Sequence, residues 1–479
     1  MKIILQLIVL ILIIPEISFA QRILTLEDAL AIALKESYGI KSAEYSLISR
    51  QKTLEAVELG LKTSINMEFD LPRYSRTLSS QFNPLTGIEE FFAVGYTTLE
   101  SRLFFSQPIV FSNGNFSLVG SLWRRNQFKE GQNIPIDYYS NLSLRLRQPI
   151  FAFNSLSASL LRAEINSQIS ERNYTRAEKE IIYSTTAGFY RLYQAKKNVE
   201  ITKEKVNQTE ISYNTAINKF KAGLIAEVEA LQLEVDLASS KNELLNSERN
   251  FTEGKDEFKL LVGLQLEEEI DVIAELDYYP IKVDVTTAID YALANRSELL
   301  NSKSDIELRN ISVDEVDSRG NISALVTANF GINKNDNTLR DIFRDFAEDR
   351  SLIFTLSIPV LDWGRNRREV ESASADLDLA YLNYQNQKQQ IQKEIIAIIN
   401  KLESAKARVD VLSKSVEVAQ KSYDISLARF RAGTITSFDL SQIQLRLTDA
   451  KINSLSALID YKLSVADLAR KTLHDFDNK

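Results

Sequence analysis

The sequence predicts a mainly α fold that also contains β strands, built from a duplicated unit of a helix, strands and a long helical hairpin. Three observations predict it. An internal repeat covers most of the 479 residues, stretches without Gly or Pro are long enough for unusually long helices, and short segments alternate apolar and polar residues. With 44% hydrophobic and 25% charged residues, the chain has the composition of a folded protein.

The first 20 residues predict a cleaved signal peptide. Lys2 precedes an apolar run over 3–14, and residues 18–20 fit the small-x-small cleavage pattern before Gln21. The run is too short for a spanning helix, although an N-terminal anchor helix is the alternative. No later stretch approaches the ~20 apolar residues that a membrane helix needs, so any membrane span must come from strands.

The composition argues against several kinds of site. The chain has no Cys, and its single histidine, His474, lies near the C-terminus. Thiol catalysis, disulfides and thiolate metal sites are therefore excluded, and His-based catalysis or zinc chemistry is not expected. Acids and bases are mixed along a chain of net charge −8, which argues against a nucleic-acid partner. We expect no enzyme activity, cofactor or metal.

The chain is internally duplicated. Phe220-Lys-Ala-Gly223 recurs as Phe430-Arg-Ala-Gly433, an offset of 430 − 220 = 210. Ala33-Leu34 matches Ala292-Leu293 at an offset of 259. The difference, 259 − 210 = 49, places 49 extra residues in the first copy, between about 65 and 145.

These offsets predict the organisation of the chain. The signal peptide (1–20) precedes the first repeat (21–270), a linker (271–285) and the second repeat (286–479). We expect each repeat to begin with a helix. In the first repeat, strands with an insertion at about 75–140 and a helical hairpin at 153–262 follow. In the second repeat, strands at 321–361 and a helical hairpin at 364–473 follow.

The hairpin helices are too long for an ordinary core. Between Gly364 and Gly433 there is no Gly or Pro, and apolar or small residues from Ile391 to Phe430 recur at alternating steps of four and three, a heptad seam. A helix over about 155–222 would extend ~100 Å at 1.5 Å per residue. A left-handed glycine, Gly223 or Gly433, is expected to end each long helix.

Four segments alternate with the period of a strand, at 65–71, 142–147, 322–333 and 352–358. In a membrane barrel one face of such strands meets lipid and the other meets water. Four strands cannot close a barrel, because even the smallest use about eight, so other copies must complete it. A further hairpin is expected at about 99–111 and 116–128, either inside the barrel wall or outside it.

The sequence combines the duplicated order of elements, the strand exits at 147–151 and 357–364, and the turns at 220–224 and 430–434. By these features the chain resembles the TolC family of outer-membrane efflux and secretion channels. The resemblance covers essentially the whole mature chain. It implies a homotrimer with a trimeric α-helical barrel as periplasmic tunnel and a 12-stranded outer-membrane β-barrel, with four principal strands per protomer.

The resemblance also implies a location, a function and partners. The chain would lie in the outer membrane of a Gram-negative-type cell, in contact with its lipid. It would be the passive conduit of a tripartite efflux pump or type I secretion system, beside a periplasmic adaptor (membrane fusion) protein and an inner-membrane pump. The adaptor-contacting positions at the hairpin tips would be Phe220, Gly223, Leu224, Phe430, Gly433 and Thr434.

An entrance gate is implied in the same way. The family's carboxylates at the constricted entrance fall on Asp439 and, three residues on, Gln442, which is not acidic here. Glu229 matches Asp439 at 439 − 229 = 210, and Glu227 lies two residues before it. Acids in the first turn of a helix also complement the positive end of its dipole, and that interpretation stays open.

A soluble periplasmic coiled-coil scaffold or adaptor is the alternative function. It accounts for the long helices, because periodicity alone does not distinguish a soluble bundle from a tunnel. It does not account for the alternating strands that precede the long helices in both copies. An adaptor would also need β-rich domains that flank the helical hairpin, and the sequence predicts none there.

Overall fold

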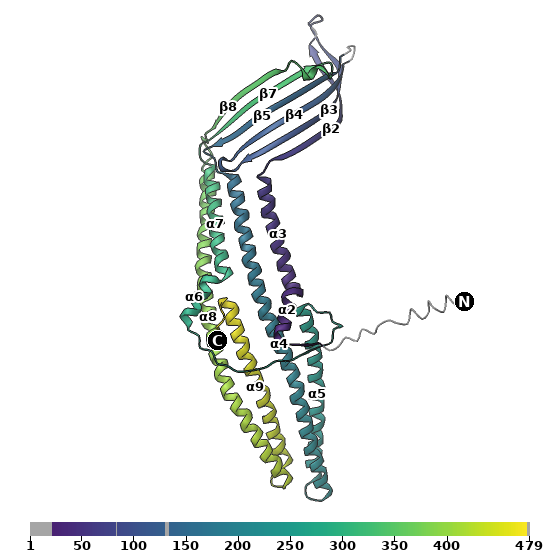
Figure 1. Ribbon diagram of the computed structural model, residues 1–479, viewed down its shortest axis with the longest axis vertical. Coiled ribbons are helices and arrows are strands. Elements are labelled where there is room, and N and C mark those ends of the chain that lie inside the picture. The colour runs from purple at the N-terminus through teal and green to yellow at the C-terminus, as the bar shows by residue number, and fades with distance from the viewer. Residues whose placement is uncertain (1–21, 83, 130–133, 477–479) are drawn as a thin grey trace, which may run out of the picture. The chain divides into compact units, whose positions relative to one another are not determined.

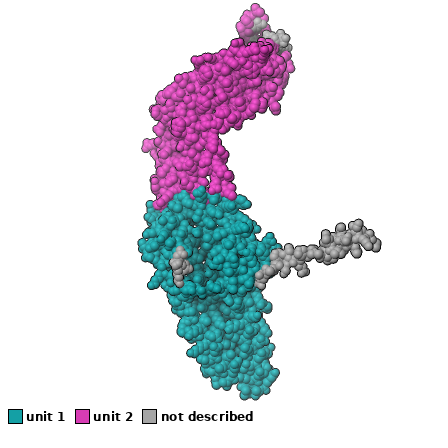
Figure 2. All heavy atoms as spheres, in the orientation of Figure 1, with its two compact units in different colours: residues 1–47, 171–300, 385–479 teal, residues 48–170, 301–384 magenta. Residues whose placement is uncertain are grey.

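The computed structural model describes residues 22–82, 84–129 and 134–476, which form two compact units (Figures 1 and 2). Residues up to 47, 171–300 and from 385 on make the helical unit, and residues 48–170 and 301–384 make the sheet unit. The predicted signal peptide, 1–20, lies outside the described residues. Four helices, α3, α4, α7 and α8, have residues in both units.

The helices recur at the two offsets seen in the sequence. Helices α4 (Ser155–Lys221) and α8 (Arg365–Arg431) have 67 residues each, and α5 (Glu227–Val262) and α9 (Ser437–Thr472) have 36 each, all offset by 365 − 155 = 437 − 227 = 210. The shorter helices match at the other offset, 285 − 26 = 259. Helix α2 (Leu26–Glu36) corresponds to α6 (Val285–Asn295), and α3 (Tyr38–Gly60) corresponds to α7 (Ser297–Ser318).

Apolar seams hold the helical hairpins together. Along α8 the seam residues Ile391, Ile395 and Leu402 are fully buried. In α4, Gly188 marks a close approach to α5, because a Cβ atom there would lie 2.5 Å from Leu261 Cδ2. Glycine lowers helix propensity by about 1 kcal/mol, so its place inside a 67-residue helix reflects this packing.

Caps and a short ladder order the ends of the shorter helices. Thr25 and Asp28 form a capping box at α2, and Asp284 caps α6. The strands β1 (Arg22–Leu24) and β6 (Ile270–Val272) pair in parallel beside α2. This ladder was not predicted, because three-residue strands are too short to show a period. None of the helices in the described ranges has both the length and the apolar character of a membrane span.

The strands of the sheet unit form one antiparallel sheet in the order β2-β3-β4-β5-β7-β8 (Figure 1). Their bounds are β2 (Ser64–Phe82), β3 (Glu89–Ile109), β4 (Gly114–Lys129), β5 (Asp137–Ile150), β7 (Ser323–Asp336) and β8 (Ala347–Ser357). In the connection from β7 to β8, the turn η2 (Asp341–Phe343) buries Ile342, and the Ser140 hydroxyl donates to its carbonyl.

The sheet has six strands, two more than the four principal strands per protomer that the resemblance implies. The predicted extra hairpin corresponds to β3 and β4, which lie between β2 and β5 in the sheet. Strand β2 also runs on to Phe82, well past the predicted end at 71. A register shift between Asp70 and Arg73 interrupts the alternation there, and Pro72 cannot donate to the ladder, so the sequence pattern breaks where the strand continues.

Candidate functional site

The two hairpin tips have the same turn. At the first tip, Gly223 has φ +70°, its N–H donates to Phe220 O at 2.8 Å, and the Leu224 N–H donates to Lys219 O at 2.9 Å. These two bonds form a Schellman motif, which satisfies the last carbonyls of α4. Gly433 repeats it with φ +81° and bonds to Phe430 O and, from Thr434, to Arg429 O. Both glycines therefore have the predicted left-handed conformation.

The predicted adaptor-contacting residues differ in exposure. Leu224 is 72% exposed, Phe220 is 38% exposed, and both glycines and Thr434 lie at the surface. Phe430 is only 1% exposed. Its ring packs in an apolar cluster with Tyr423 and Leu440, so Phe430 supports the tip from inside and presents no side chain to a partner in this conformation.

Contacts between the two hairpins form what we call the hairpin clasp: Lys219–Phe430, Glu229–Ser437 and Asp236–Ser441. The Lys219 ammonium donates to Phe430 O and lies 4.6 Å from the centre of the Phe430 ring. The Ser441 hydroxyl donates to Asp236 Oδ2 at 2.6 Å. Residues of both hairpins pack around these bonds, and burial raises the pKa of Tyr423 to about 12. The clasp fixes one hairpin against the other.

Two of the predicted gate acids, Asp439 and Glu229, accept hydrogen bonds at the N-terminus of α9. Asp439 occupies the third position of α9 and forms a capping box with Thr436. In α5 the equivalent cap position is Ala226, whose side chain cannot accept a hydrogen bond. Glu229, the equivalent of Asp439, instead accepts from the Ser437 N–H at 3.4 Å and so reaches the first residue of α9. Both acids therefore lie beside the N-terminus of α9, where a carboxylate complements the positive end of the helix dipole.

The other two gate positions, Glu227 and Gln442, are exposed and belong to neither cap. Sequence reasoning missed Gln444. It is 4% exposed, and its amide donates to Lys205 O at 3.0 Å and to Thr209 Oγ1 at 2.7 Å across the two hairpins. Its place between the buried Leu440 and Leu447, at steps of four and three, was the available signal, since a polar seam residue needs a partner.

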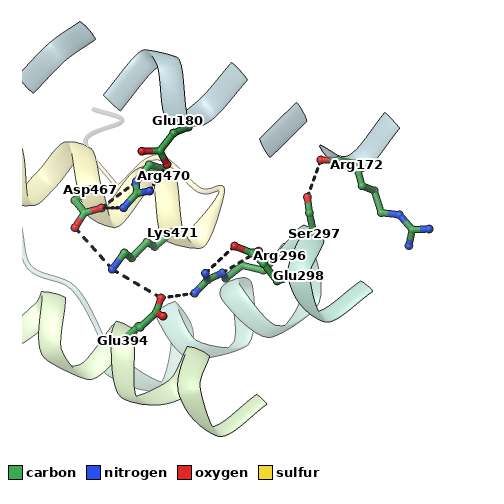
Figure 3. A network of polar contacts seen from close by, with 9 residues as sticks. All are labelled: Arg172, Glu180, Arg296, Ser297, Glu298, Glu394, Asp467, Arg470 and Lys471. Carbon is green, nitrogen blue, oxygen red and sulfur yellow. Dashed lines mark hydrogen bonds and ion pairs between the residues drawn. The ribbon is translucent and has the colours of Figure 1, made fainter. Parts of the chain in front are cut away.

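A second polar cluster connects helices of the first and second sequence repeats within the helical unit (Figure 3). Arg296, between α6 and α7, donates to Glu298 at 2.9 and 3.3 Å and to Glu394 of α8 at 2.8 Å. Lys471 of α9 lies 3.8 Å from Glu394, and Arg470 pairs with Glu180 of α4. We call this set the equatorial network; Asp467 and the Ser297–Arg172 hydrogen bond complete it.

Burial and pairing compete in the equatorial network. Burial disfavours the charge of Arg296, but its bonds to Glu298 and Glu394 outweigh burial and hold its pKa above the usual value. Burial likewise pushes the pKa of Glu298 up, yet the bonds from Arg296 win and lower it. Across the described ranges, no group of three or more His, Cys, Asp or Glu side chains is placed to hold a metal ion.

The sheet has an apolar face and a polar face. Residues paired directly across neighbouring strands point to the same side. One register row runs through Ile65, Phe105, Leu118, Leu144 and Phe330, and it belongs to the apolar face. On β8, Leu352, Phe354 and Leu356 pair with β7 residues of the same face and are 52–76% exposed.

The opposite face is polar. A register row three residues away along each strand runs through Glu68, Arg102, Ser121, Asn141 and Asn333. Arg102 lies 2.9 Å from Asp70 and 3.5 Å from Glu100. A large exposed apolar surface on one side of a sheet marks contact with a membrane or a partner, whereas the polar side can face water.

Comparisons with known proteins match this architecture. A family model described as outer membrane efflux protein matches residues 115–263 and 288–472. The outer membrane protein TolC of Vibrio cholerae is 23% identical over 329 residues, covering 65% of this chain and 71% of that protein.

Two solved structures share the fold. A crystal structure of CusC matches with a TM-score of 0.71 at 12% identity, and the match covers 93% of this chain and 91% of the CusC chain. The outer membrane protein VceC of Vibrio cholerae has a TM-score of 0.70 at 15% identity, with coverages of 94% and 97%.

Proposed function

This chain belongs to the outer membrane efflux protein family, and we propose that it is the outer-membrane channel of a tripartite efflux pump or type I secretion system. In this proposal three copies form a passive conduit from the periplasm to the exterior. The energy for transport comes from an inner-membrane pump that reaches the channel through a periplasmic adaptor.

The observation that carries the proposal is the two-faced sheet with its unpaired edges. Among the described residues, β2 and β8 are the first and last strands of the sheet, so each pairs on one side only. In hydrocarbon an unpaired backbone edge costs several kcal/mol per group, so a lipid-facing sheet must be closed. A neighbouring copy can close it by placing its β2 beside β8. The apolar faces then meet lipid and the polar faces line a water-filled lumen.

The long helices support the tunnel. Each 67-residue helix extends ~100 Å at 1.5 Å per residue, which suits a wall that crosses a wide aqueous compartment. Helices α5 and α9 return beside them from the tips. Twelve such helices from three copies, four from each, make the α-helical barrel of the proposal.

The hairpin tips form the entrance and the adaptor surface. Leu224 and Phe220 present apolar surface at the first tip, where an adaptor can cover it. Three copies of Asp439 and Glu229 would place a ring of carboxylates at the entrance, which attracts cations and repels anions. The entrance widens when the hairpin clasp breaks.

Membrane fractionation separates this proposal from the alternative, a soluble periplasmic coiled-coil scaffold or adaptor. The channel is recovered with the outer membrane as a trimer that survives mild detergent. Release with the soluble periplasmic contents as a monomer would favour the alternative and reject the channel.

The adaptor surface has its own test. Leu224→Glu at the exposed tip, or Gly433→Trp in the turn, should abolish crosslinking to the adaptor while trimers persist in the outer membrane. Leu245→Glu is the matched control, because Leu245 is 65% exposed but lies in the middle of α5. Normal crosslinking of both tip variants would reject docking at the tips.

A further inference from the structure

The extra residues of the first copy form one complete antiparallel hairpin. Strands β2 and β7 begin at matching places, since 323 − 64 = 259, and the long helices match at an offset of 210. The added length therefore lies between the start of β2 and the start of α4. In the second copy β7 pairs directly with β8, but in the first copy β3 and β4 separate β2 from β5.

This hairpin is hydrogen-bonded into the sheet on both sides. Strand β3 pairs with β2 from Glu89 to Ser106 and with β4 from Val94 to Ile109. Strand β4 pairs in turn with β5 from Asn115 to Arg125. An excursion outside the sheet would instead leave β2 and β5 to pair with each other.

The faces of the hairpin continue the faces of its neighbours. Leu103 of β3 and Gly120 of β4 lie in one register row between Met67 of β2 and Leu142 of β5, on the apolar face. Leu103 is 47% exposed. The polar face also continues, because Arg102 of β3 makes its ion pairs there. A hairpin standing in water on both sides gains nothing from this alternation, whereas a barrel wall requires it.

We propose that β3 and β4 are part of the membrane wall and that three copies, each with a six-stranded sheet, close an 18-stranded barrel. The occupant of each open edge is a second copy of this chain, with β8 of one protomer beside β2 of the next. The inference rests on the proposed outer-membrane channel and replaces the 12-stranded barrel that the family resemblance implies.

The added strands widen the pore at the outer membrane. With strands ~4.8 Å apart and tilted by ~40°, 18 strands give a backbone diameter of roughly 36 Å, against roughly 24 Å for 12. Membrane barrels of 16–18 strands already leave an open aqueous channel.

Spin labels on single cysteines test the wall directly, because the chain has no cysteine of its own. Leu103→Cys and Leu118→Cys place labels on the apolar face of the hairpin, and Thr98→Cys and Ser121→Cys place them on its polar face. Leu144→Cys and Ser143→Cys on β5 are the matched pair in the wall predicted from the sequence. The labelled trimer is reconstituted in lipid bilayers, and collisions with oxygen and with a water-soluble nickel chelate are compared.

The proposal expects Leu103→Cys and Leu118→Cys to behave like Leu144→Cys, with high oxygen and low nickel accessibility. Thr98→Cys and Ser121→Cys should resemble Ser143→Cys, with high nickel accessibility. High nickel accessibility at all four hairpin sites, with Leu144→Cys still in lipid, would place the hairpin outside the wall and overturn the proposal alone. High nickel accessibility at Leu144→Cys as well would overturn the channel itself.

Discussion

Lys219→Met should shift the entrance toward its open state, because Lys219 makes the contact of the hairpin clasp that combines a charge with an aromatic ring. Its ammonium donates to Phe430 O and lies over the Phe430 ring at 4.6 Å. Methionine keeps much of the unbranched aliphatic stem but loses both interactions. The other lysine in the last turn of α4, Lys221, is exposed.

The size of the effect follows from these two contacts. A hydrogen bond to a charged group contributes about 1.5–3 kcal/mol. A cation–π contact at an exposed site adds about 0.5–1 kcal/mol. Lys219 is partly exposed, so the lower ends of both ranges apply and the sum is about 2 kcal/mol. Since every 1.4 kcal/mol is tenfold, the closed state should lose roughly 30-fold in relative population per protomer.

Single-channel recording in planar bilayers measures this shift as the fraction of time spent open. We expect Lys219→Met to raise the open fraction, Lys219→Arg to restore it partly, and the matched control Lys221→Met to leave it unchanged. Equal open fractions for Lys219→Met and wild type would refute the clasp as a closing contact. A rise with Lys221→Met of the same size would show that only the charge of the turn matters.

Three further predictions concern the equatorial network and the α9 cap. Arg296→Met should lower the opening free energy of the first turn of α7 by about 2–3 kcal/mol in hydrogen exchange. It leaves the carboxylates of Glu298 and Glu394, which are 27% and 38% exposed, without their partner. A loss no larger than that of Arg296→Lys would contradict the bidentate pairing. The pKa of Glu298 is lowered from 4.5, so its stabilising contribution is complete above pH 4.5 and disappears as the pH falls through its folded-state pKa. Glu298→Gln should therefore flatten the dependence of Tm on pH in acid, and an unchanged dependence would argue against this contribution. Asp439→Ala should destabilise the start of α9 by about 1 kcal/mol, because it removes the capping box with Thr436. It should also raise single-channel conductance and weaken divalent block, and unchanged conductance and block would reject the carboxylate gate.

The helical hairpins could be predicted from the sequence because their signals are local. A stretch without Gly or Pro continues a helix, and a left-handed glycine ends it, so Gly223 and Gly433 marked both tips. The different fates of the two tip phenylalanines could not be predicted. Phe220 and Phe430 share one motif, yet they are 38% and 1% exposed, because packing of one hairpin on the other decides burial.

The sheet could be predicted only in part, for a physical reason. Alternation tells which residues of a strand share a face, but it does not tell which strand lies beside it. The residues of β3 and β4 therefore indicated a hairpin and left its place open, and only the pairing with β2 and β5 puts it in the sheet. The cap that Glu229 supplies to Ser437 was hidden for the same reason, since its partners are 208 residues apart.

The most direct test of the account is the mass of the mature protein extracted from outer membranes and measured intact in detergent. If neighbouring copies seal the edges of a lipid-facing sheet, the particle is a trimer that needs detergent to remain in solution. A single chain that stays dissolved after the detergent is removed would contradict the account.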